Sequence, residues 1–310
     1  MILTVTLNPA IDKQYLVDAL CPNEVMRVNS VSNTAGGKGL NVSRVAALAG
    51  ERVAAMGFVG GHTGEQFESL LCEPQIEKCF TRVKAQTRCC INVRDQGANR
   101  STEFLEPGEP VTQSDISRFV HDFQARLLTA DVVTISGSMP AGVPEDFYAD
   151  LIKMCREAGK PVILDTSGRA LEVSLAAKPD WIKPNTDEIR QILKTEISSR
   201  EQIIQAAKEL HAAGIPNVAV SLGKDGVLVV CKEGVYFGST PDLPVVNTVG
   251  CGDSMVAGFA VGTARGMPME ETIRFAVAVS TANALVRETG SYRAEDLEKI
   301  LPQIQVEVHA

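Results

Sequence analysis

The stretch from Val132 to Asp165 reads VVTISGSMPAGVPEDFYADLIKMCREAGKPVILD. It begins and ends with short runs rich in Val and Ile, Val132–Ser136 and Val162–Asp165, which are typical of strands buried in a sheet. Between them, Glu145–Ala158 has a helical pattern that stops at Gly159, as helices commonly do at a C-terminal glycine. The stretch therefore predicts one strand–helix–strand unit of a parallel sheet.

The same alternation of strand and helix runs through most of the chain. Further helices are expected at Lys38–Ala49 and Glu201–Ala213, which stop at Gly50 and Gly214. The other core strands are expected at Leu3–Leu7, Val53–Val59, Trp181–Lys183 and Val218–Leu222. We therefore predict an α/β fold with a doubly wound, mostly parallel sheet that is covered by helices on both faces, as a single domain over residues 1–310.

Two stretches do not follow this alternation. Residues 11–32 and 79–105 contain short alternating runs that are separated by turn-like polar residues. We expect both stretches to leave the main sheet and to form together a small antiparallel β flap. Such a flap can act as a lid, as a dimer interface or as both, or it can consist of ordinary edge hairpins with no mechanical role.

The composition narrows the class of protein. Of the 310 residues, 45% are hydrophobic and 22% are charged, which is enough apolar material for a large core. The formal charge is −8 without a concentrated run of Lys or Arg, so nucleic acid and anionic membranes are not expected as partners. Met1–Asn8 alternates like a strand rather than a signal segment, and the eight cysteines lack metal-ligand spacing. We expect a soluble, cytoplasmic protein with free thiols.

The residues that follow the expected strands indicate where a ligand binds, because ligands of open α/β sheets lie beyond the carboxyl ends of the strands. Small and polar residues occupy these positions at Asn8, Ser136–Pro140, Asp165–Gly168, Lys183–Asn185 and Ser221–Gly223. Turn chemistry alone accounts for part of this enrichment. We predict a continuous polar rim above one edge of the sheet.

The most informative segment for chemistry is NTVGCGDSMVAG at residues 247–258. Residues 249–252, called the glycine turn below, directly precede a helix of small residues that is expected to end at Gly266. The main-chain N–H groups of this turn can point into a common concavity at the positive end of the helix, which suits an anion. Asp253 can be stabilised there by the helix dipole alone, as in any helix. Beside an anion site, it is also what a general base for attack by a hydroxyl group requires.

Two further segments have ligand-binding chemistry. The segment GGKGLN at residues 36–41 is not a Walker A loop, but its glycines allow the backbone to approach a polyhydroxy substrate, and Asn41 can bind two hydroxyls. In the segment KPNTDE at residues 183–188, Asn185 and Glu188 lie three residues apart at a helix start. Their oxygens can hold the water shell of Mg²⁺, or they can simply begin a solvated helix.

Four ordered blocks of the chain resemble the ribokinase-like (PfkB) carbohydrate kinases, and the similarity spans essentially the whole sequence. The blocks are GGKGLN at 36–41, SGSMP at 136–140, KPNTDE at 183–188 and TVGCGD at 248–253. The chain is most similar to the branch of 1-phosphofructokinases and tagatose-6-phosphate kinases, by TLNPAID at 6–12, Thr87-Arg88, TEFLEPG at 102–108 and DTSG at 165–168. Cys251 departs from the family pattern, in which Ala or Ser is commoner at this position.

The resemblance implies roles for individual residues. Asp253 would be the general base, and the main chain of Gly250, Cys251 and Gly252 would stabilise the transferred phosphoryl group. The sugar phosphate would be bound by Asp12, Gly36, Gly37, Lys38, Asn41, Arg88 and Ser138. ATP would be bound by Lys183, Asn185, Glu188, Ser221, Gly223, Gly226, Thr248 and Asn283. Mg²⁺ would be held through water by Asn185 and Glu188, and K⁺ is a further candidate cofactor.

The resemblance also implies an activity, the ATP-dependent phosphorylation of a phosphorylated ketohexose. Fructose 1-phosphate is the first candidate substrate and tagatose 6-phosphate the second, while the flap would close over the sugar and build a homodimer. Arg88 favours a phosphorylated sugar, because a guanidinium suits a dianionic phosphate better than a hydroxyl. A catalytically silent sugar-phosphate sensor would gain nothing from Asp253. A dinucleotide oxidoreductase would need a G-x-G-x-x-G motif after the first strand, which is missing.

Overall fold

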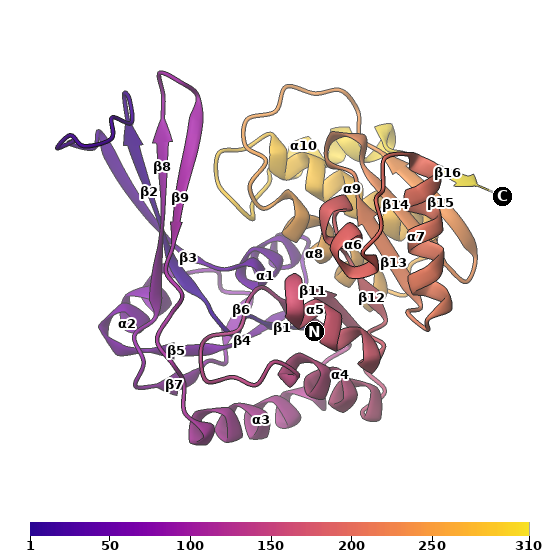
Figure 1. Ribbon diagram of the computed structural model, residues 1–310, viewed down its shortest axis with the longest axis horizontal. Helices are drawn as coiled ribbons and strands as arrows, with labels where there is room; N and C mark the ends of the chain where they lie inside the picture. Colours follow the sequence, from indigo (N-terminus) through magenta and orange to yellow (C-terminus); the bar gives the residue numbers. More distant parts are fainter. Residues whose placement is uncertain (310) are drawn as a thin grey trace.

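The computed structural model describes residues 1–309, and a ten-stranded sheet forms its centre (Figure 1). The strands follow the order β16-β15-β14-β13-β12-β11-β10-β1-β4-β6. The strands from β6 to β13 pair in parallel, and β14, β15 and β16 pair antiparallel at one side. Their bounds are Ile2–Val5 (β1), Val53–Met56 (β4), Ile76–Lys78 (β6), Val132–Ser136 (β10), Val162–Asp165 (β11), Trp181–Ile182 (β12), Asn217–Ser221 (β13), Val227–Cys231 (β14), Gly234–Ser239 (β15) and Gln305–His309 (β16). The predicted mostly parallel sheet is confirmed.

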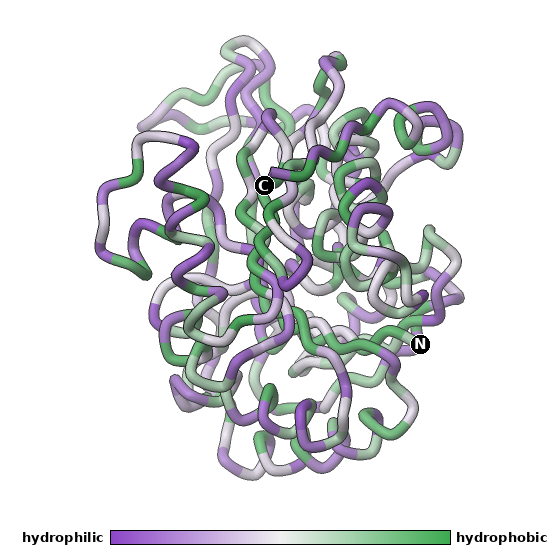
Figure 2. Tube along the Cα trace, turned by 90° about the vertical axis from the view of Figure 1, so that its right-hand side faces the viewer, coloured by the Kyte–Doolittle hydropathy of each residue, from purple (hydrophilic) through white to green (hydrophobic). Residues whose placement is uncertain are grey.

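Helices cover both faces of this sheet. Successive residues of a strand point to opposite faces, and in the central strands the residues on both faces are apolar and need to be buried. Val132 and Ile163 belong to the core on one face, whereas Val133 and Leu164 belong to the core on the other. The first face packs against α1 (Lys38–Leu48), α2 (Gly61–Leu70), α8 (Cys251–Ala264), α9 (Met269–Ala284) and α10 (Ala294–Ile300). The second packs against α3 (Gln113–Leu127), α4 (Phe147–Glu157), α5 (Gly168–Ser174), α6 (Thr186–Leu193) and α7 (Arg200–Ala212). Hydrophobic segments accordingly concentrate in the middle of the molecule (Figure 2). The doubly wound fold is therefore confirmed.

The predicted strand at Val53–Val59 is in fact two strands. It breaks at Gly57, between β4 and β5 (Phe58–Gly60), and β5 pairs in parallel with β7 (Thr81–Val83) in a separate small sheet. A Cβ atom on Gly57 would lie 2.0 Å from the main-chain oxygen of Thr6, so only glycine fits at this close approach of two backbones. The sequence pattern alone does not reveal this contact, because Thr6 is distant along the chain.

The flap exists, but its predicted antiparallel pairing is only partly right. Its four strands follow the order β3-β2-β8-β9, with β2 (Ala10–Val17), β3 (Ser30–Gly36), β8 (Arg88–Asp95) and β9 (Arg100–Leu105). Two antiparallel hairpins are joined through β2 and β8, which are parallel to each other. The first strand of each hairpin, β2 in one and β8 in the other, runs outward from the body of the protein. Because they run in the same direction, these two strands are parallel (Figure 1). The flap reaches Gly36 rather than residue 32, and Thr81–Val83 lies outside it.

Within residues 1–309, none of the helices combines the length and the apolar character that crossing a membrane requires. The longest helices, α3 and α9, have 15 and 16 residues.

Candidate active site

The sequence-predicted residues meet at the carboxyl edge of the sheet, where α1 and α8 begin side by side (Figure 1). The helix α8 begins after Gly250 and ends at Ala264, where Arg265 is the C-cap and the predicted Gly266 follows with a positive φ. Its first turn contains Asp253, whose side chain is only 7% exposed. The amide Nδ2 of Asn41, from α1, donates a hydrogen bond to Asp253 Oδ2 at 2.8 Å. Two of the predicted residues, 212 positions apart in sequence, are thus in direct contact.

The pKa of the Asp253 carboxyl group lies closer to neutral pH than that of an ordinary aspartate. Burial is the main reason why its pKa is raised to about 6, and the nearby charge of Asp165 raises the pKa further. Lys38, the Asn41 hydrogen bond and Lys183 act in the opposite direction. A carboxylate with a pKa near 6 is a stronger base than an exposed one and is still ionised at neutral pH, which suits a general base.

Asp165 is a site residue to which the sequence analysis gave no role. It ends β11, its side chain is 1% exposed, and it pairs with Lys38 Nζ at 3.3 Å and with Lys183 Nζ at 3.4 Å. Burial alone raises its pKa, but the two ammonium groups outweigh burial and hold the pKa of Asp165 below its ordinary value. Asp165 chiefly raises the pKa of Lys38, and the charges of Asp253 and Glu188 also contribute. Lys38 therefore lies among the acidic groups of the site, beside Asp253.

Only part of the glycine turn offers free main-chain donors. The N–H of Val249 donates to Asn247 Oδ1 at 3.0 Å, and the N–H of Cys251 donates to the main-chain oxygen of Thr248 at 3.3 Å. These two groups were predicted to face an anion, but they stabilise the turn itself. The N–H groups of Gly250 and Gly252 have no acceptor among residues 1–309. They remain the donors for an anion at the start of α8.

The thiol of Cys251 takes little part in this chemistry. Burial raises its pKa, and its Sγ accepts a hydrogen bond from Asn283 Nδ2 at 3.4 Å. A neutral, half-buried thiol is a weak nucleophile and is slow to oxidise. The departure from the family pattern at this position is therefore compatible with a main-chain role.

On the flap side, Asp12 lies against the two glycines that precede α1. A Cβ atom on Gly36 would lie 2.0 Å from Asp12 Oδ2, so any side chain at this position would displace the carboxylate. Burial raises the pKa of Asp12 to about 6, against the opposing charges of Arg44 and Arg88 and a hydrogen bond from the main chain of Gly37. Asp12, Gly36 and Gly37, three residues of the predicted sugar site, therefore form one polar surface.

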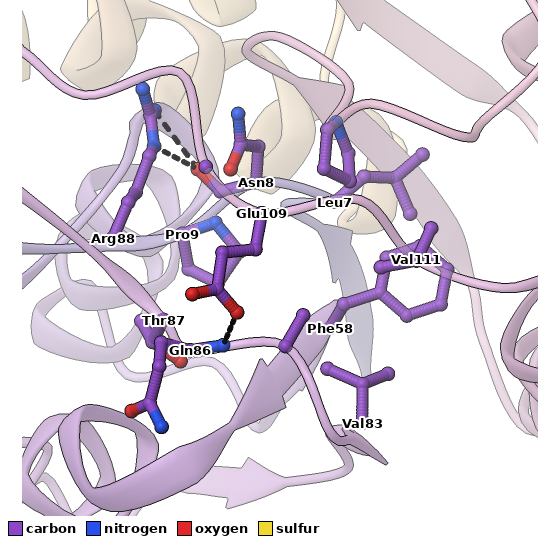
Figure 3. A pocket seen from close by; sticks show the side chains of 13 residues that line it. Leu7, Asn8, Pro9, Phe58, Val83, Gln86, Thr87, Arg88, Glu109 and Val111 are labelled. Atoms are coloured by element: carbon purple, nitrogen blue, oxygen red, sulfur yellow. Dashed lines mark hydrogen bonds between the residues drawn. The ribbon is translucent and has the colours of Figure 1, made fainter.

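Arg88 begins β8 at the base of the flap, beside a small pocket (Figure 3). Its Nε and Nη2 donate to the main-chain oxygen of Asn8 at 3.2 and 3.0 Å, and its Nη1 donates to that of Glu106 at 2.7 Å. Asn8 Nδ2 in turn donates to the main-chain oxygen of Pro107 at 3.0 Å and to Ser138 Oγ at 3.4 Å. Arg88 was predicted to face the substrate phosphate alone. With three of its five N–H groups on carbonyls, it also ties the flap to the end of β1.

On the opposite side, the residues predicted to bind the nucleotide are gathered at the ends of β12 and β13. Asn185 and Ser221 form an isolated parallel bridge, and the turn that contains Gly223 and Gly226 follows β13. Thr248 lies exposed beside the glycine turn. Lys183 is buried, with its Nζ 3.4 Å from the place of a Cβ atom on Gly252. A second ammonium group therefore lies at the start of α8.

Asn185 and Glu188 form a capping box at the start of α6. Asn185 Oδ1 accepts from the N–H groups of Asp187 and Glu188, and Glu188 Oε2 accepts from the N–H of Asn185. The plain interpretation of a solvated helix start is thus correct for these atoms. Both lone pairs of Asn185 Oδ1 are used within the helix start. Glu188 Oε1 is not part of the capping box, and it is an oxygen ligand of the kind that Mg²⁺ prefers together with water.

Asn283 does not fit the predicted contact with adenine. Its side chain is fully buried, and both ends of its amide bind the protein. Nδ2 donates to the main-chain oxygen of Val249 at 3.1 Å, and Oδ1 accepts from the N–H groups of Gly290 and Ser291 at 3.0 and 3.2 Å. Because the donor and the acceptor of this amide are both bonded to the protein, neither is free to form a hydrogen bond with adenine. The family resemblance alone gave the nucleotide role of Asn283, and it did not distinguish the two roles.

Comparison with known proteins agrees with this geometry. The sequence matches the family described as pfkB family carbohydrate kinase over residues 5–296. The chain belongs to this family. It is an ATP-dependent sugar kinase with a ribokinase-like fold, and the kinase activity that the sequence blocks implied is confirmed.

Individual members of the pfkB family align over nearly the full chain. A tagatose-6-phosphate kinase of Staphylococcus epidermidis is 38% identical over 309 residues, which cover 99% of each chain. Phosphofructokinase-2 of Escherichia coli, solved in complex with potassium, has a TM-score of 0.90 at 30% identity and covers 97% of this chain and 98% of its own. A possible 1-phosphofructokinase of Thermotoga maritima has a TM-score of 0.90 at 28% identity, with 100% and 99% covered.

The residues present fit the cofactors of a pfkB kinase. The free N–H groups of Gly250 and Gly252, with Lys183 beside them, suit the phosphates of ATP, because all three are donors to anions. Glu188 Oε1 supplies a hard oxygen ligand, and Mg²⁺ commonly keeps several of its own waters beside a few such ligands.

The raised pKa of Asp253 predicts the pH dependence of turnover. Only the ionised carboxylate can accept a proton, so kcat at saturating substrates should rise as the pH increases through about 6 and then level off. The measurement is kcat from the steady-state release of ADP across the pH range, with Mg²⁺ in excess at each pH. A kcat that stays flat between about pH 5 and 8 would contradict the assignment of Asp253 as the base.

Proposed function

We propose that the chain transfers the γ-phosphoryl group of ATP to a free primary hydroxyl of a ketohexose phosphate, giving a ketohexose bisphosphate. The observation that carries this proposal is the buried Asp253, held by Asn41 at 2.8 Å, directly beside the free N–H groups of Gly250 and Gly252. A base for the hydroxyl and donors for the developing phosphoryl charge are the two requirements of this reaction.

Each residue of the site is proposed to have its own role in the reaction. Asp253 accepts the proton of the sugar hydroxyl, and Asn41 orients the carboxylate that does so. When bound, MgATP supplies the phosphoryl group, and the metal ion neutralises charge on its oxygens. Lys38 and Lys183, both paired with Asp165, add positive charge where the phosphoryl group moves. Closure of the flap over the sugar excludes water, which prevents transfer to water.

The sugar phosphate is proposed to lie between Asp12 and the base of the flap. Asp12 binds sugar hydroxyls, and Arg88 directs its remaining N–H groups to the phosphate of the substrate. Lys38 was predicted to share this phosphate, but its neighbours Asp253 and Glu188 favour the reacting end instead. In this arrangement the phosphate and the accepting hydroxyl are at opposite ends of the sugar, as both substrate candidates require.

Fructose 1-phosphate and tagatose 6-phosphate both meet this requirement, because each has a phosphate at one terminal carbon and a hydroxyl at the other. The sequence marks are divided, because the block at residues 102–108 favours tagatose 6-phosphate and the block at residues 248–253 favours fructose 1-phosphate. The names of the relatives favour tagatose 6-phosphate, since the Staphylococcus epidermidis enzyme is the more similar in sequence at 38% identity. We propose tagatose 6-phosphate as the first substrate to test and fructose 1-phosphate as the second.

A coupled ADP-release assay tests the proposal. The panel is tagatose 6-phosphate, fructose 1-phosphate, fructose 6-phosphate, tagatose 1-phosphate and the free hexoses, each with and without K⁺. The proposal expects kcat/KM for at least one phosphorylated ketohexose to exceed that of any free hexose by ~10²-fold or more, because a charge-assisted phosphate contact is lost in the free sugars. Equal turnover of free and phosphorylated sugars would refute it.

We further propose that the flap builds a homodimer. Residues that are paired across neighbouring strands project to the same face of the flap. By the pairing of the four strands, one set of apolar side chains lies on the face that points away from Asp12. These side chains are Tyr15, Val31, Ile91, Val93 and Phe104. Val31 is 51% and Phe104 57% exposed, which favours a protein partner for this face.

Replacement Phe104→Asp should therefore turn the dimer into a monomer of 33.2 kDa, because it puts a charge into an apolar interface. Sedimentation velocity over a range of protein concentrations measures the change. The matched control is Leu128→Asp, which adds the same charge at a side chain that is 80% exposed and lies outside the flap. A wild-type chain that sediments as a monomer, or a Phe104→Asp variant that remains a dimer, would contradict the proposal.

A further inference from the structure

Two side chains of α9 hold main-chain carbonyl groups of the glycine turn. Asn283 Nδ2 donates to the main-chain oxygen of Val249 at 3.1 Å, and Ser280 Oγ donates to that of Cys251 at 2.9 Å. Ser280 and Asn283 are three residues apart, so they project from the same face of α9. Both are buried, with 8% and 0% of their surface exposed.

The planarity of the peptide bond gives these contacts a consequence for the anion site. In a trans peptide the C=O of one residue and the N–H of the next point in opposite directions. The C=O of Val249 belongs to the same peptide unit as the N–H of Gly250, and the C=O of Cys251 to the same unit as the N–H of Gly252. Anchoring these two carbonyls to α9 therefore turns the two free N–H groups away from α9.

The other end of the Asn283 amide reaches the general base through two contacts. Its Oδ1 accepts from the N–H of Gly290, and a Cβ atom on Gly290 would lie 2.8 Å from Cα of Asn41. The turn at Gly290 therefore packs directly on Asn41, which donates to Asp253. One fully buried side chain thus links the anion donors on one side to the partner of the base on the other.

We propose that Asn283 is a positioning residue of the phosphoryl-transfer centre, in which its amide, supported by Ser280, aims the N–H groups of Gly250 and Gly252 at the transferred phosphoryl group and keeps Asn41 in place against Asp253. It acts through the main chain and does not contact either substrate. This inference rests on the proposed function, in that the glycine turn stabilises phosphoryl charge.

Replacement Asn283→Ala should lower kcat by at least ~10-fold, because the free N–H donors lose their direction when the Val249 carbonyl is released. The KM values for ATP and for the sugar phosphate should stay within ~3-fold of the wild type, since no substrate contact is removed. Ser280→Ala should have a smaller effect, because the Cys251 carbonyl lies in the first turn of α8 and can also accept within the helix. Thr281→Val is the matched control, because its buried hydroxyl bonds only to Val277 of the same helix.

A second variant guards against misfolding. Asn283→Asp has the same shape and can still accept from the N–H groups of Gly290 and Ser291, but its ionised carboxylate cannot donate to the Val249 carbonyl. Burial without a cationic partner disfavours the ionised form and lowers stability. The variant is therefore assayed at a temperature at which circular dichroism shows it to be folded, and it should then show the same selective loss of kcat. Amide hydrogen exchange supplies a readout that does not depend on activity. Exchange in residues 247–256 and 286–292 should increase together in Asn283→Ala and stay unchanged in Thr281→Val.

The outcomes separate this inference from the proposed function. A folded Asn283→Ala variant with wild-type kcat overturns the inference, and so does a raised KM for ATP with unchanged kcat, which would return Asn283 to the nucleotide site. Unchanged exchange in the two segments also overturns it. If the wild-type chain turned over no phosphorylated ketohexose, the proposed function would fail, and the exchange experiment would still decide whether Asn283 couples the two segments.

Discussion

Replacement Asp253→Asn is expected to lower kcat by at least ~10²-fold and to leave the KM values nearly unchanged, the usual result of removing a general base. The amide keeps the shape of the carboxylate and can still accept the hydrogen bond from Asn41, but it cannot accept a proton. Initial rates of ADP release at saturating sugar phosphate and ATP measure this effect directly.

The stability of this variant should not fall. Burial and the charge of Asp165 raise the pKa of Asp253 to about 6, so folding disfavours the ionised form at every pH above that value, and a neutral amide removes this penalty. The matched control is Asp296→Asn, because Asp296 also lies in the first turn of a helix, α10, but pairs with Arg293 at the surface. Wild-type turnover by Asp253→Asn would exclude the carboxylate as the base.

Replacement Asp165→Asn should cost about 3–5 kcal/mol of the free energy of unfolding, because it leaves a buried ammonium group without its partner. The side chains of Asp165 and Lys183 are 1% and 6% exposed, so water cannot replace the lost ion pair. Lys38 is 44% exposed and contributes less of this cost. Urea unfolding near neutral pH measures the change, and kcat should fall as well, because both lysines lose the group that positions them.

The pH dependence of the stabilisation by Asp165 and two comparison variants test this prediction further. Because the pKa of Asp165 is lowered, its contribution is present above the ordinary value of 3.8 and is lost as the pH falls below it. Asp150→Asn should cost under about 1 kcal/mol, since the pair of Asp150 with Lys153 is exposed. The double replacement Asp165→Asn with Lys183→Met should recover part of the loss. A cost for Asp165→Asn no larger than that for Asp150→Asn would contradict a buried ion pair.

Much of the fold could be predicted from the sequence, because its signals are local in the chain. The strand Val132–Ser136 coincides with β10, and the helix that was expected at Glu145–Ala158 is α4, Phe147–Glu157, followed by its predicted glycine. Glycines 250 and 252 beside Asp253 predicted a helix start with free donors, and α8 begins there. Periodicity, helix ends and turn glycines depend on neighbours only a few residues away.

Contacts between distant segments could not be predicted in the same way. Asp165 follows a strand like many other polar residues, and its role depends on Lys38, which is 127 positions away. The parallel pair of β2 and β8 depends on how two hairpins leave the body, and each hairpin alone gives an antiparallel pattern. Val249 and Cys251 lost their predicted role because their N–H groups find acceptors within the folded turn.

The sequence by itself determined the α/β class and the position of the glycine turn, and it indicated Asp253 as the candidate base, since each depends on residues that are adjacent or periodically spaced. Only the tertiary structure decided which main-chain donors stay free, which lysines Asp165 holds, and that the amide of Asn283 is bonded to the glycine turn. The physical reason is that a hydrogen bond or an ion pair forms between groups a few ångströms apart, and the order of the strands in the sheet decides which groups those are.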